Sequence, residues 1–427
     1  MQATVIIIGA EILLGRVTDT NSGTIARALD PLSIEIVNIQ TVDDDAPAIR
    51  QAVERALEST DLVLVTGGLG PTKDDITKRV LMEIFGGELV FNDSVYEDVQ
   101  AVFSRKHLNM NRLTHDQALV PTSCRVIRNP YGTAPVMWFE RDGKVLVSMP
   151  GVPAETTPLI NGAVRQAIAG RFAPESHYAH RTLQVTGISE SGLAERLEDW
   201  ESRLPAGFKL AYLPDSPVIK LRIDGCGGDA DVVEADIDRL YKELSDSLGH
   251  LVFAHGEEPL PAVLLNRLRE QVNEHTGKNW TLCTAESCTG GNIAHVITEV
   301  AGCSDVFNGG IVSYSNDVKM SVLGVPAETL DQYGAVSEQT VRAMLEGALR
   351  CTHSDCAVAT SGIAGPTGGT TDKPVGTVYI GAQVPGLEPL IIRHQITGAR
   401  TTFIQRATRT ALLQLMQLLT SVPDTEA

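Results

Sequence analysis

Twice in this chain a short apolar run ends in a glycine-rich turn that leads into a helical pattern. Residues 61–65 lead into a turn at 66–72 that contains three glycines. Residues 280–283 lead into 284–291 (Thr-Ala-Glu-Ser-Cys-Thr-Gly-Gly), and a helical segment is predicted at 292–298. Strands that alternate with helices indicate a parallel sheet covered by helices on both faces, and ligands bind beyond the carboxyl ends of such strands. We therefore expect both turns at ligand sites.

Ser287 is expected on the strand-to-helix turn, and two interpretations of it are open. Ser287 or Thr289 can simply cap the helix, which such residues do often. Alternatively, Ser287 is a nucleophile if a base lies within reach. Gly290 and Gly291 would then let backbone N–H groups approach a developing oxyanion.

The length and the punctuation of the chain predict three domains. A chain of 427 residues should hold two or three domains. Proline-containing polar stretches at 171–177 and 253–259 are candidate boundaries. We predict an α/β parallel-sheet domain at residues 1–170, a small α+β domain at 177–252 and a second α/β domain at 257–427.

Composition restricts the function classes. The net charge of −18 argues against a duplex nucleic-acid binder, which would carry a basic face. No apolar run approaches the roughly 18 residues of a membrane span. The seven cysteines lack zinc-site spacing, so we expect buried thiols in a reducing cytoplasm, and no signal peptide is apparent.

Two carboxylates, Asp74 and Asp75, follow the first glycine-rich turn. They can favour a helix dipole from its first turn, which is common. They can also hold a divalent metal while backbone N–H groups of the turn hold a phosphate. The whole pattern, Thr-Gly-Gly-x-Gly-Pro-Thr-x-Asp-Asp-x-Thr over residues 66–77, is much more specific than a glycine-rich turn alone.

The first domain resembles the N-terminal domain of the competence/damage-inducible CinA family, which is similar to molybdopterin-binding domains. The resemblance rests on residues 9–15, 19–21, 66–77, 129–135 and 149–155. It implies metal-dependent hydrolysis of ADP-ribose to AMP and ribose 5-phosphate. The residues implied are Asp75, Asp74 and Glu11 for the metal, and, for the substrate, Asn21, Gly67, Gly68, Gly70 and Thr72. The sequence departs from the family pattern at Ala10, Val136 and Thr156.

The last domain resembles the nicotinamide-nucleotide amidohydrolase domain with which CinA proteins end. Ser287, Tyr314 and Lys319 carry the resemblance, with residues 361–366, 373–376 and 398–400. It implies a serine nucleophile, Ser287, with Lys319 as base and Tyr314 assisting. Thr289, Gly290, Gly291, Ser361 and Arg400 are the implied substrate-binding residues. Ser361 and Ala399 replace a threonine and an aspartate of the family pattern, and Cys288 is a rival nucleophile.

Together these features predict a bifunctional hydrolase that deamidates nicotinamide mononucleotide and cleaves ADP-ribose. We expect a divalent metal ion of unknown identity in the N-terminal domain and no cofactor in the C-terminal domain. The middle domain resembles the family's KH-like domain, but it lacks a basic Gly-x-x-Gly clamp, so we expect no nucleic-acid partner. A homodimer is expected. The alternatives are a single-activity deamidase with a ligand-binding N-terminal domain, or a scaffold for DNA-uptake or repair proteins.

Overall fold

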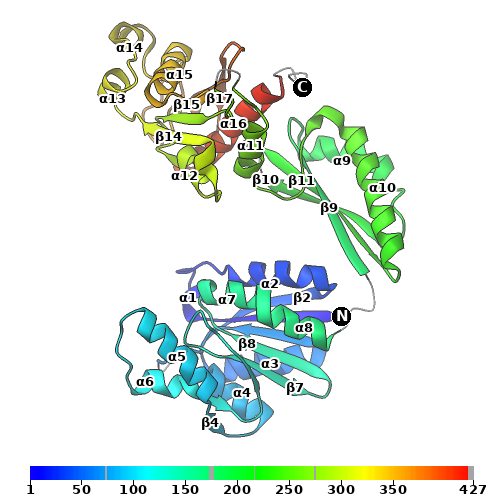
Figure 1. The fold of residues 1–427 in the computed structure, drawn as a ribbon. Coiled ribbons are helices and arrows are strands. Elements are labelled where there is room, and N and C mark those ends of the chain that lie inside the picture. The colour runs from blue at the N-terminus through cyan, green and yellow to red at the C-terminus, as the bar shows by residue number, and fades with distance from the viewer. Residues whose placement is uncertain (73–74, 173–176, 216, 274–275, 422–427) are drawn as a thin grey trace. The chain divides into compact units, whose positions relative to one another are not determined.

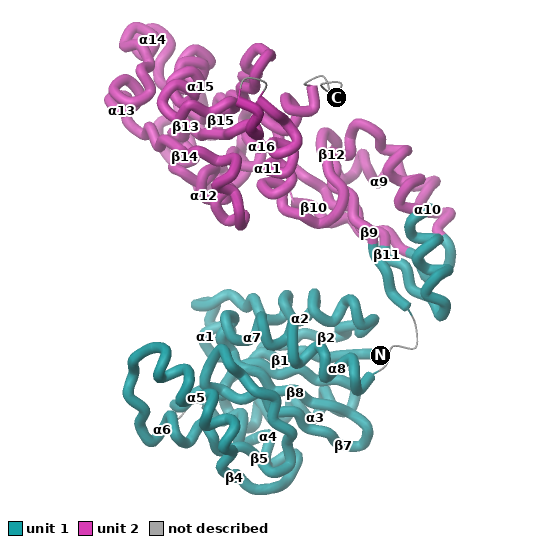
Figure 2. Tube along the Cα trace, in the orientation of Figure 1, with its two compact units in different colours: residues 1–180, 205–208, 224–239 teal, residues 181–204, 209–223, 240–427 magenta. Residues whose placement is uncertain are grey.

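The computed structural model describes residues 1–72, 75–172, 177–215, 217–273 and 276–421. The chain forms two compact units (Figure 2). Unit 1 comprises residues 1–180, 205–208 and 224–239, and unit 2 comprises residues 181–204, 209–223 and 240–427. The division passes through the segment that the sequence predicts as a separate middle domain.

Unit 1 is built on a six-stranded mixed sheet (Figure 1). Its strand order is β2 (Glu35–Val42), β1 (Gln2–Ile8), β3 (Leu62–Thr66), β8 (Lys144–Met149), β7 (Val136–Arg141) and β6 (Arg125–Ile127). The first four strands are parallel, as expected, whereas β7 and β6 run antiparallel to their neighbours. The parallel sheet that the sequence predicts is thus extended by an antiparallel edge at β7 and β6.

Helices bury both faces of this sheet. Alternate residues of β1 show this, since they belong to two different apolar clusters. Ile7 packs with α2 (Asn21–Leu29), α7 (Pro153–Leu159) and α8 (Arg165–Arg171), whereas Ile6 packs with α3 (Ala46–Ser59) and α4 (Thr77–Phe85). The other α-helices and strands of residues 1–172 are α1 (Ala10–Leu13), α5 (Asp93–Arg105), α6 (Arg112–His115), β4 (Leu89–Phe91) and β5 (Leu119–Pro121). Burial on both faces places the chemistry at the ends of the strands.

The segment between the two α/β parts forms a four-stranded sheet with two helices. The strand order is β10 (Phe208–Asp215), β11 (Val218–Gly227), β9 (His177–Val185) and β12 (Val252–His255). The helices are α9 (Glu190–Glu201) and α10 (Ala230–Leu248). This is the α+β character that the sequence predicts, although β12 continues beyond the predicted end at residue 252.

The C-terminal part holds a five-stranded sheet in the order β14 (Phe307–Val312), β13 (Leu282–Glu286), β15 (Cys356–Gly362), β16 (Thr377–Gln383) and β17 (Leu390–Gln395). The first three strands are parallel and the last two are antiparallel. One apolar cluster joins this sheet to α11 (Leu260–Arg269), α12 (Asn292–Thr298) and α16 (Arg400–Thr420). A second cluster joins its other face to α13 (Asn316–Ser321), α14 (Ala327–Tyr333) and α15 (Glu338–Thr352).

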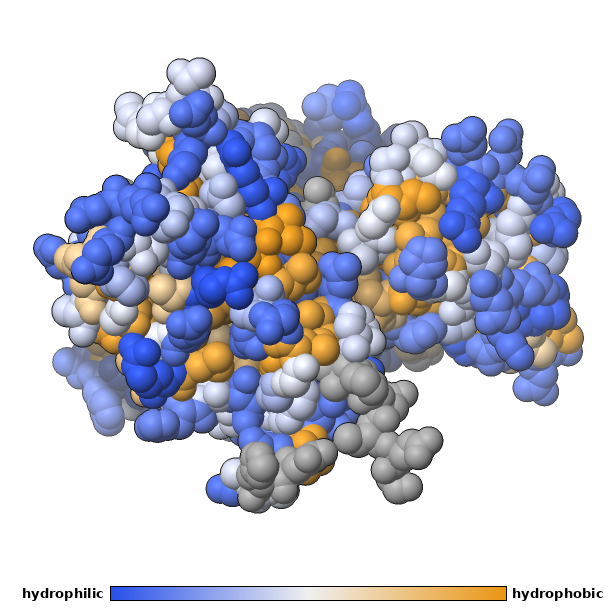
Figure 3. Space-filling view, turned by 90° about the horizontal axis from the view of Figure 1, so that it is seen from above, coloured by the Kyte–Doolittle hydropathy of each residue, from blue (hydrophilic) through white to orange (hydrophobic). Residues whose placement is uncertain are grey.

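The surface seen in Figure 3 is mostly hydrophilic, with apolar side chains exposed in patches. None of the helices in the described part of the chain combines the length and the apolar character that crossing a membrane requires.

Candidate functional site

The C-terminal site lies where three parallel strands end. Strand β13 ends at Glu286, and Ser287 opens the turn into α12. Strand β14 ends next to Ser313 and Tyr314, and Ser361 lies near the end of β15. The carboxyl ends of parallel neighbours meet at one edge, so three separate segments contribute side chains to one place.

Ser287 and Lys319 form a buried pair. Lys319 Nζ lies 3.1 Å from Ser287 Oγ and donates to the carbonyl oxygen of Ser313 at 2.7 Å. The Lys319 side chain comes from α13 and is 1% exposed, while Ser287 is 9% exposed. Burial lowers the pKa of Lys319. The neutral amine, which is the form that can accept a proton from a serine hydroxyl, is thereby favoured.

A cavity of about 200 Å³ adjoins the pair. It is lined by Ser287, Cys288, Tyr314, Asn316, Lys319, Ala335, Val336, Ser361, Gly362, Ala364 and Arg400. This volume is below that of the pockets that enclose drug-sized ligands, which measure about 300–1,000 Å³, so the cavity suits a ring better than a whole nucleotide. Any larger substrate must therefore extend out through the mouth.

Arg400 and Tyr314 contact each other at this cavity. One guanidinium nitrogen of Arg400 donates to Tyr314 Oη at 2.7 Å, and another donates to the carbonyl oxygen of Gly365 at 2.9 Å. Tyr314 is 60% exposed. An arginine held in this way offers a fixed positive charge to an anionic group of a ligand outside the cavity.

Two expectations for the turn do not fit the structure. The N–H of Gly290 donates to Ser287 O at 3.1 Å, and that of Gly291 donates to Glu286 Oε2 at 3.0 Å, so neither is available to an oxyanion. Thr289 is buried and its hydroxyl contacts Thr360 Oγ1 at 2.8 Å, away from the cavity lining. The two glycines are instead required by backbone conformation, with φ values of 64° and 96°.

Cys288, the rival nucleophile, is held inactive by its surroundings. Its side chain belongs to the apolar cluster around α16, and burial raises the pKa of its thiol to about 12. The thiolate is the nucleophilic form of cysteine, so it is scarce here at neutral pH. Buried thiols were expected throughout, but that holds for Cys283, Cys288 and Cys356, whereas Cys226 and Cys351 are exposed.

In unit 1 the first glycine-rich turn forms a close backbone cradle at the ends of β1, β3 and β8. A Cβ atom on Gly67 would lie 2.2 Å from Ile8 O, and one on Gly68 would lie 2.1 Å from Thr77 Oγ1. Gly151, after β8, is also close to the turn, because a Cβ atom on it would lie 3.2 Å from Gly67 Cα. The φ values of Gly67 and Gly68, 106° and 64°, also favour glycine.

Two buried polar atoms at this cradle have no hydrogen-bond partner among the residues that the structure describes. Asn21 donates through Nδ2 to Gly151 O at 2.8 Å, which leaves its buried Oδ1 without a partner. The buried hydroxyl of Thr77, against Gly68, is also unpartnered. Buried polar groups are normally satisfied, so these two atoms are free to bond a polar group that enters the cradle.

Of the three predicted metal residues, Asp75 and Glu11 lie in the described part of the chain. Asp75 Oδ2 accepts from Thr72 N at 2.9 Å and from Thr72 Oγ1 at 2.5 Å, beside Gly70. The carboxylate of Glu11 lies against Gly9, and Asp74 lies outside the described residues. Among the residues described, no three His, Cys, Asp or Glu side chains gather at a point. A divalent ion fits this donor set only if phosphate oxygens of a substrate complete its shell, as is usual for Mg²⁺.

Sequence reasoning missed Glu155, a carboxylate that contacts the segment 129–135. Glu155 Oε2 accepts from Asn129 Nδ2 at 2.7 Å, and Gly132 lies so close that a Cβ would clash with it. Burial raises the pKa of Glu155. Residues 129–135 and 149–155 both belong to the motifs that carry the family resemblance, but their spacing in the sequence does not show that these two segments meet.

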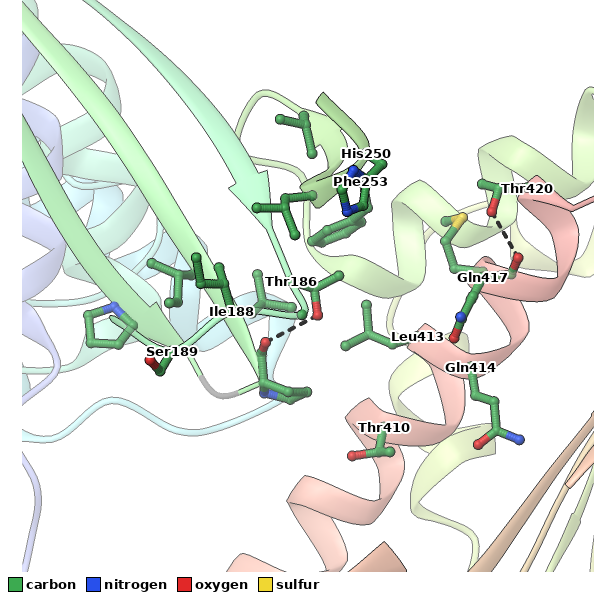
Figure 4. Close-up of a pocket in the computed structure, with 18 of the residues that line it drawn as sticks. Thr186, Ile188, Ser189, His250, Phe253, Thr410, Leu413, Gln414, Gln417 and Thr420 are labelled. Atoms are coloured by element: carbon green, nitrogen blue, oxygen red, sulfur yellow. Dashed lines mark hydrogen bonds between the residues drawn. The ribbon is translucent and has the colours of Figure 1, made fainter. Parts of the chain in front are cut away.

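A cavity of about 1060 Å³, larger than the one beside Ser287, lies elsewhere in unit 2 (Figure 4). In the close-up, Ile188 and Phe253 approach it from one side, while Leu413 and Gln417 of α16 approach it from the other. Most of its lining is apolar, and neither Ser287 nor Lys319 belongs to it. Size alone therefore does not identify the reactive site.

Comparison with known proteins identifies the family. Three family models match: a probable molybdopterin binding domain over residues 4–170, a damage-inducible protein CinA KH domain over 180–254 and a CinA C-terminal domain over 265–419. A CinA-like protein of Cytophaga hutchinsonii is 40% identical over 415 residues, which is 97% of each chain. This chain belongs to the CinA family. A CinA-like protein of Flavobacterium psychrophilum is 38% identical over 90% of this CinA chain and 91% of its own.

Among solved structures, the competence/damage inducible protein CihA from Agrobacterium tumefaciens is 40% identical. The match covers 38% of this CinA chain and 96% of the other, with a TM-score of 0.35. The pair Ser287–Lys319 falls within the match to the CinA C-terminal domain, and the glycine cradle falls within the match to the molybdopterin binding domain.

Proposed function

We propose that this CinA protein is a cytoplasmic hydrolase that deamidates nicotinamide mononucleotide at its C-terminal site. The buried Ser287–Lys319 pair, 3.1 Å apart, is the observation that carries the proposal. The adjoining cavity of about 200 Å³ leaves room for a nicotinamide ring, and Arg400 supports the proposal as a cation for the nucleotide phosphate.

In the proposed reaction, Ser287 Oγ attacks the carboxamide carbon and its proton passes to Lys319 Nζ. The carbon–nitrogen bond then breaks as Lys319 returns the proton to the departing nitrogen, which leaves as ammonia. Water adds to the resulting ester by the same route, giving the carboxylate and restoring Ser287. The amine therefore acts first as base and then as acid.

We further propose that the N-terminal cradle hydrolyses ADP-ribose to AMP and ribose 5-phosphate. The unpartnered atoms of Asn21 and Thr77, and the backbone approach at Gly67, support a diphosphate ligand there. Asp75 would hold a divalent metal ion, which would neutralise phosphate charge and lower the pKa of a bound water. Glu155 would accept a proton from a hydroxyl or from water, since a general base is most effective when its pKa lies near the working pH and burial raises the pKa of Glu155 in that direction.

Two assays test these activities separately in the purified full-length protein. Ammonia release from nicotinamide mononucleotide, with Ser287→Ala as the control, tests the first. AMP release from ADP-ribose, with and without a divalent metal, tests the second. If only ammonia release is not detected, the protein is not the proposed deamidase and acts through its N-terminal site. If neither product is detected, the scaffold alternative is favoured.

A further inference from the structure

Glu286, the residue before the nucleophile, is a buried carboxylate to which the sequence assigns no role. It is the last residue of β13 and is 1% exposed. Its Oε2 accepts from Gly291 N and Ile293 N, both at 3.0 Å, and its Oε1 accepts from Ala294 N at 2.8 Å. The hydroxyl of Thr284 adds a fourth bond to Oε1 at 3.2 Å.

These bonds satisfy the start of α12 from within the chain. The first N–H groups of a helix normally lack partners and attract anions. Here three such donors are directed to Glu286, so the helix start is closed to a substrate. Of the turn itself, the N–H of Ser287 donates to Thr360 O at 3.0 Å, and that of Gly290 donates to Ser287 O.

Within the described residues, two backbone donors of the turn, the N–H groups of Cys288 and Thr289, have no acceptor on another residue, and the N–H of Cys288 contacts only its own thiol. Cys288 lines the reactive cavity together with Ser287 and Lys319, whereas Thr289 does not. In hydrolases whose nucleophile lies on a strand-to-helix turn, the N–H of the next residue stabilises the oxyanion. Cys288 occupies that place here, and only its backbone is needed.

We propose that Glu286 is a positioning residue, which fixes the turn so that the N–H of Cys288 faces the oxyanion formed on Ser287. The proposal rests on the proposed amide hydrolysis at the same site. By taking the donors at 291, 293 and 294, Glu286 sets the direction in which the turn leaves β13. A carboxylate that merely caps the helix would stabilise the fold equally but would not change the chemistry.

The test compares Glu286→Gln with the wild-type full-length protein. A glutamine keeps the size of the side chain, but one of its two oxygens is replaced by an NH₂ group, which cannot accept a hydrogen bond. The backbone N–H groups that face this NH₂ group therefore lose their acceptor. We expect kcat for nicotinamide mononucleotide to fall about 10²-fold while KM stays within about threefold, because the loss of one oxyanion donor costs about 10²–10³ in kcat. Glu299→Gln removes the same charge from an exposed position at the other end of α12, and its kinetics should match the wild type.

A second readout does not depend on the amide substrate. 3-Pyridylboronic acid forms a boron–oxygen bond with Ser287 Oγ as the serine proton passes to Lys319, giving a tetrahedral anion with no leaving group. Its Kd, measured by calorimetry, should rise in Glu286→Gln by the same factor by which kcat falls, and Ser287→Ala should not bind it. If the wild type binds the boronate but does not release ammonia, the proposed substrate is wrong while Glu286 is still tested.

Three outcomes would overturn the proposal. The first is unchanged kcat and boronate affinity in a folded Glu286→Gln protein, which would make Glu286 a helix cap only. The second is a wild type that neither turns over the amide nor binds the boronate. If Glu286→Gln does not fold, Thr284→Val takes its place, because it removes only the fourth hydrogen bond to Glu286. We expect this variant to lower kcat and to raise the Kd of the boronate by a few-fold. The third outcome that would overturn the proposal is a folded Thr284→Val protein in which both values are unchanged.

Discussion

Replacing Lys319 by arginine distinguishes a base from a substrate-binding cation. Lys319 Nζ lies 3.1 Å from Ser287 Oγ inside the fold, and burial lowers the pKa of its amine. An arginine keeps the positive charge at the same place. It cannot take up the serine proton at accessible pH, because its pKa is about 12.5 or higher.

The magnitude follows from the fraction of neutral side chain. At pH 8, a group with a pKa of about 12.5 is neutral in only about one molecule in 10⁴–10⁵. We therefore expect Lys319→Arg to lower kcat/KM for nicotinamide mononucleotide by about 10⁴-fold or more, close to the effect of Ser287→Ala. The double variant should be hardly worse than either single variant, because the two residues act as one unit.

The pH dependence of kcat/KM in the wild type shows whether the reaction needs the neutral or the charged form of Lys319. A lysine with a lowered pKa is neutral above that pKa, so kcat/KM should fall about tenfold per pH unit below it and level off above it. Ammonia release measured from pH 6 to 10 shows this limb. Normal AMP release from ADP-ribose in the same variants serves as the folding control. Lys319→Arg with most of its turnover intact would refute the Ser287–Lys319 mechanism and make Lys319 a binding residue.

Three further predictions concern the other parts of the chain. Asp75→Asn should abolish AMP release from ADP-ribose and leave ammonia release unchanged; AMP release at the wild-type rate from the folded variant would exclude Asp75 from the metal site. Since burial raises the pKa of Glu155, its folded form binds more protons than the unfolded one above about pH 4.5, and stability should fall as pH rises through the raised pKa. Thermal unfolding at pH 5 and 8 should therefore show a smaller pH effect in Glu155→Gln, and an identical effect would contradict this. A fragment that starts near Glu257 should fold and deamidate alone, somewhat less stable without Phe253, which packs on the C-terminal cluster; an unfolded fragment would show a shared core.

Much of the fold was visible in the sequence, because hydrophobic periodicity reports burial directly. The helix predicted at residues 292–298 has the same bounds in the structure, and the apolar run at 61–65 lies almost entirely in the buried strand β3 (Leu62–Thr66). The antiparallel edge at β7 was missed although its turn is marked. Asp142 and Gly143 have φ values of 52° and 80°, and Asp-Gly is a strong hairpin signal.

The site was less predictable, because side-chain and N–H directions at a turn depend on the path of the backbone. The glycines at 290 and 291 announced a tight turn, but not that their N–H groups would be taken by Ser287 O and Glu286. Residue types gave no hint that Thr289 faces Thr360. The contact between Asn129 and Glu155 joins segments 26 residues apart, which no periodicity encodes. Such contacts required the three-dimensional structure.

The surroundings of Ser287 also decide which group can act as its base. Glu286 is adjacent in sequence, but its two oxygens already accept four hydrogen bonds, three of them from backbone N–H groups at the start of α12, and these hold the carboxylate against that helix. Cys288 is adjacent on the other side, but its thiol, with a pKa of about 12, stays protonated and packs in an apolar cluster. No histidine lines the described cavity. Lys319 combines contact with Ser287 Oγ and a pKa lowered by burial, so the proton of Ser287 has one suitable acceptor among the residues that line the cavity.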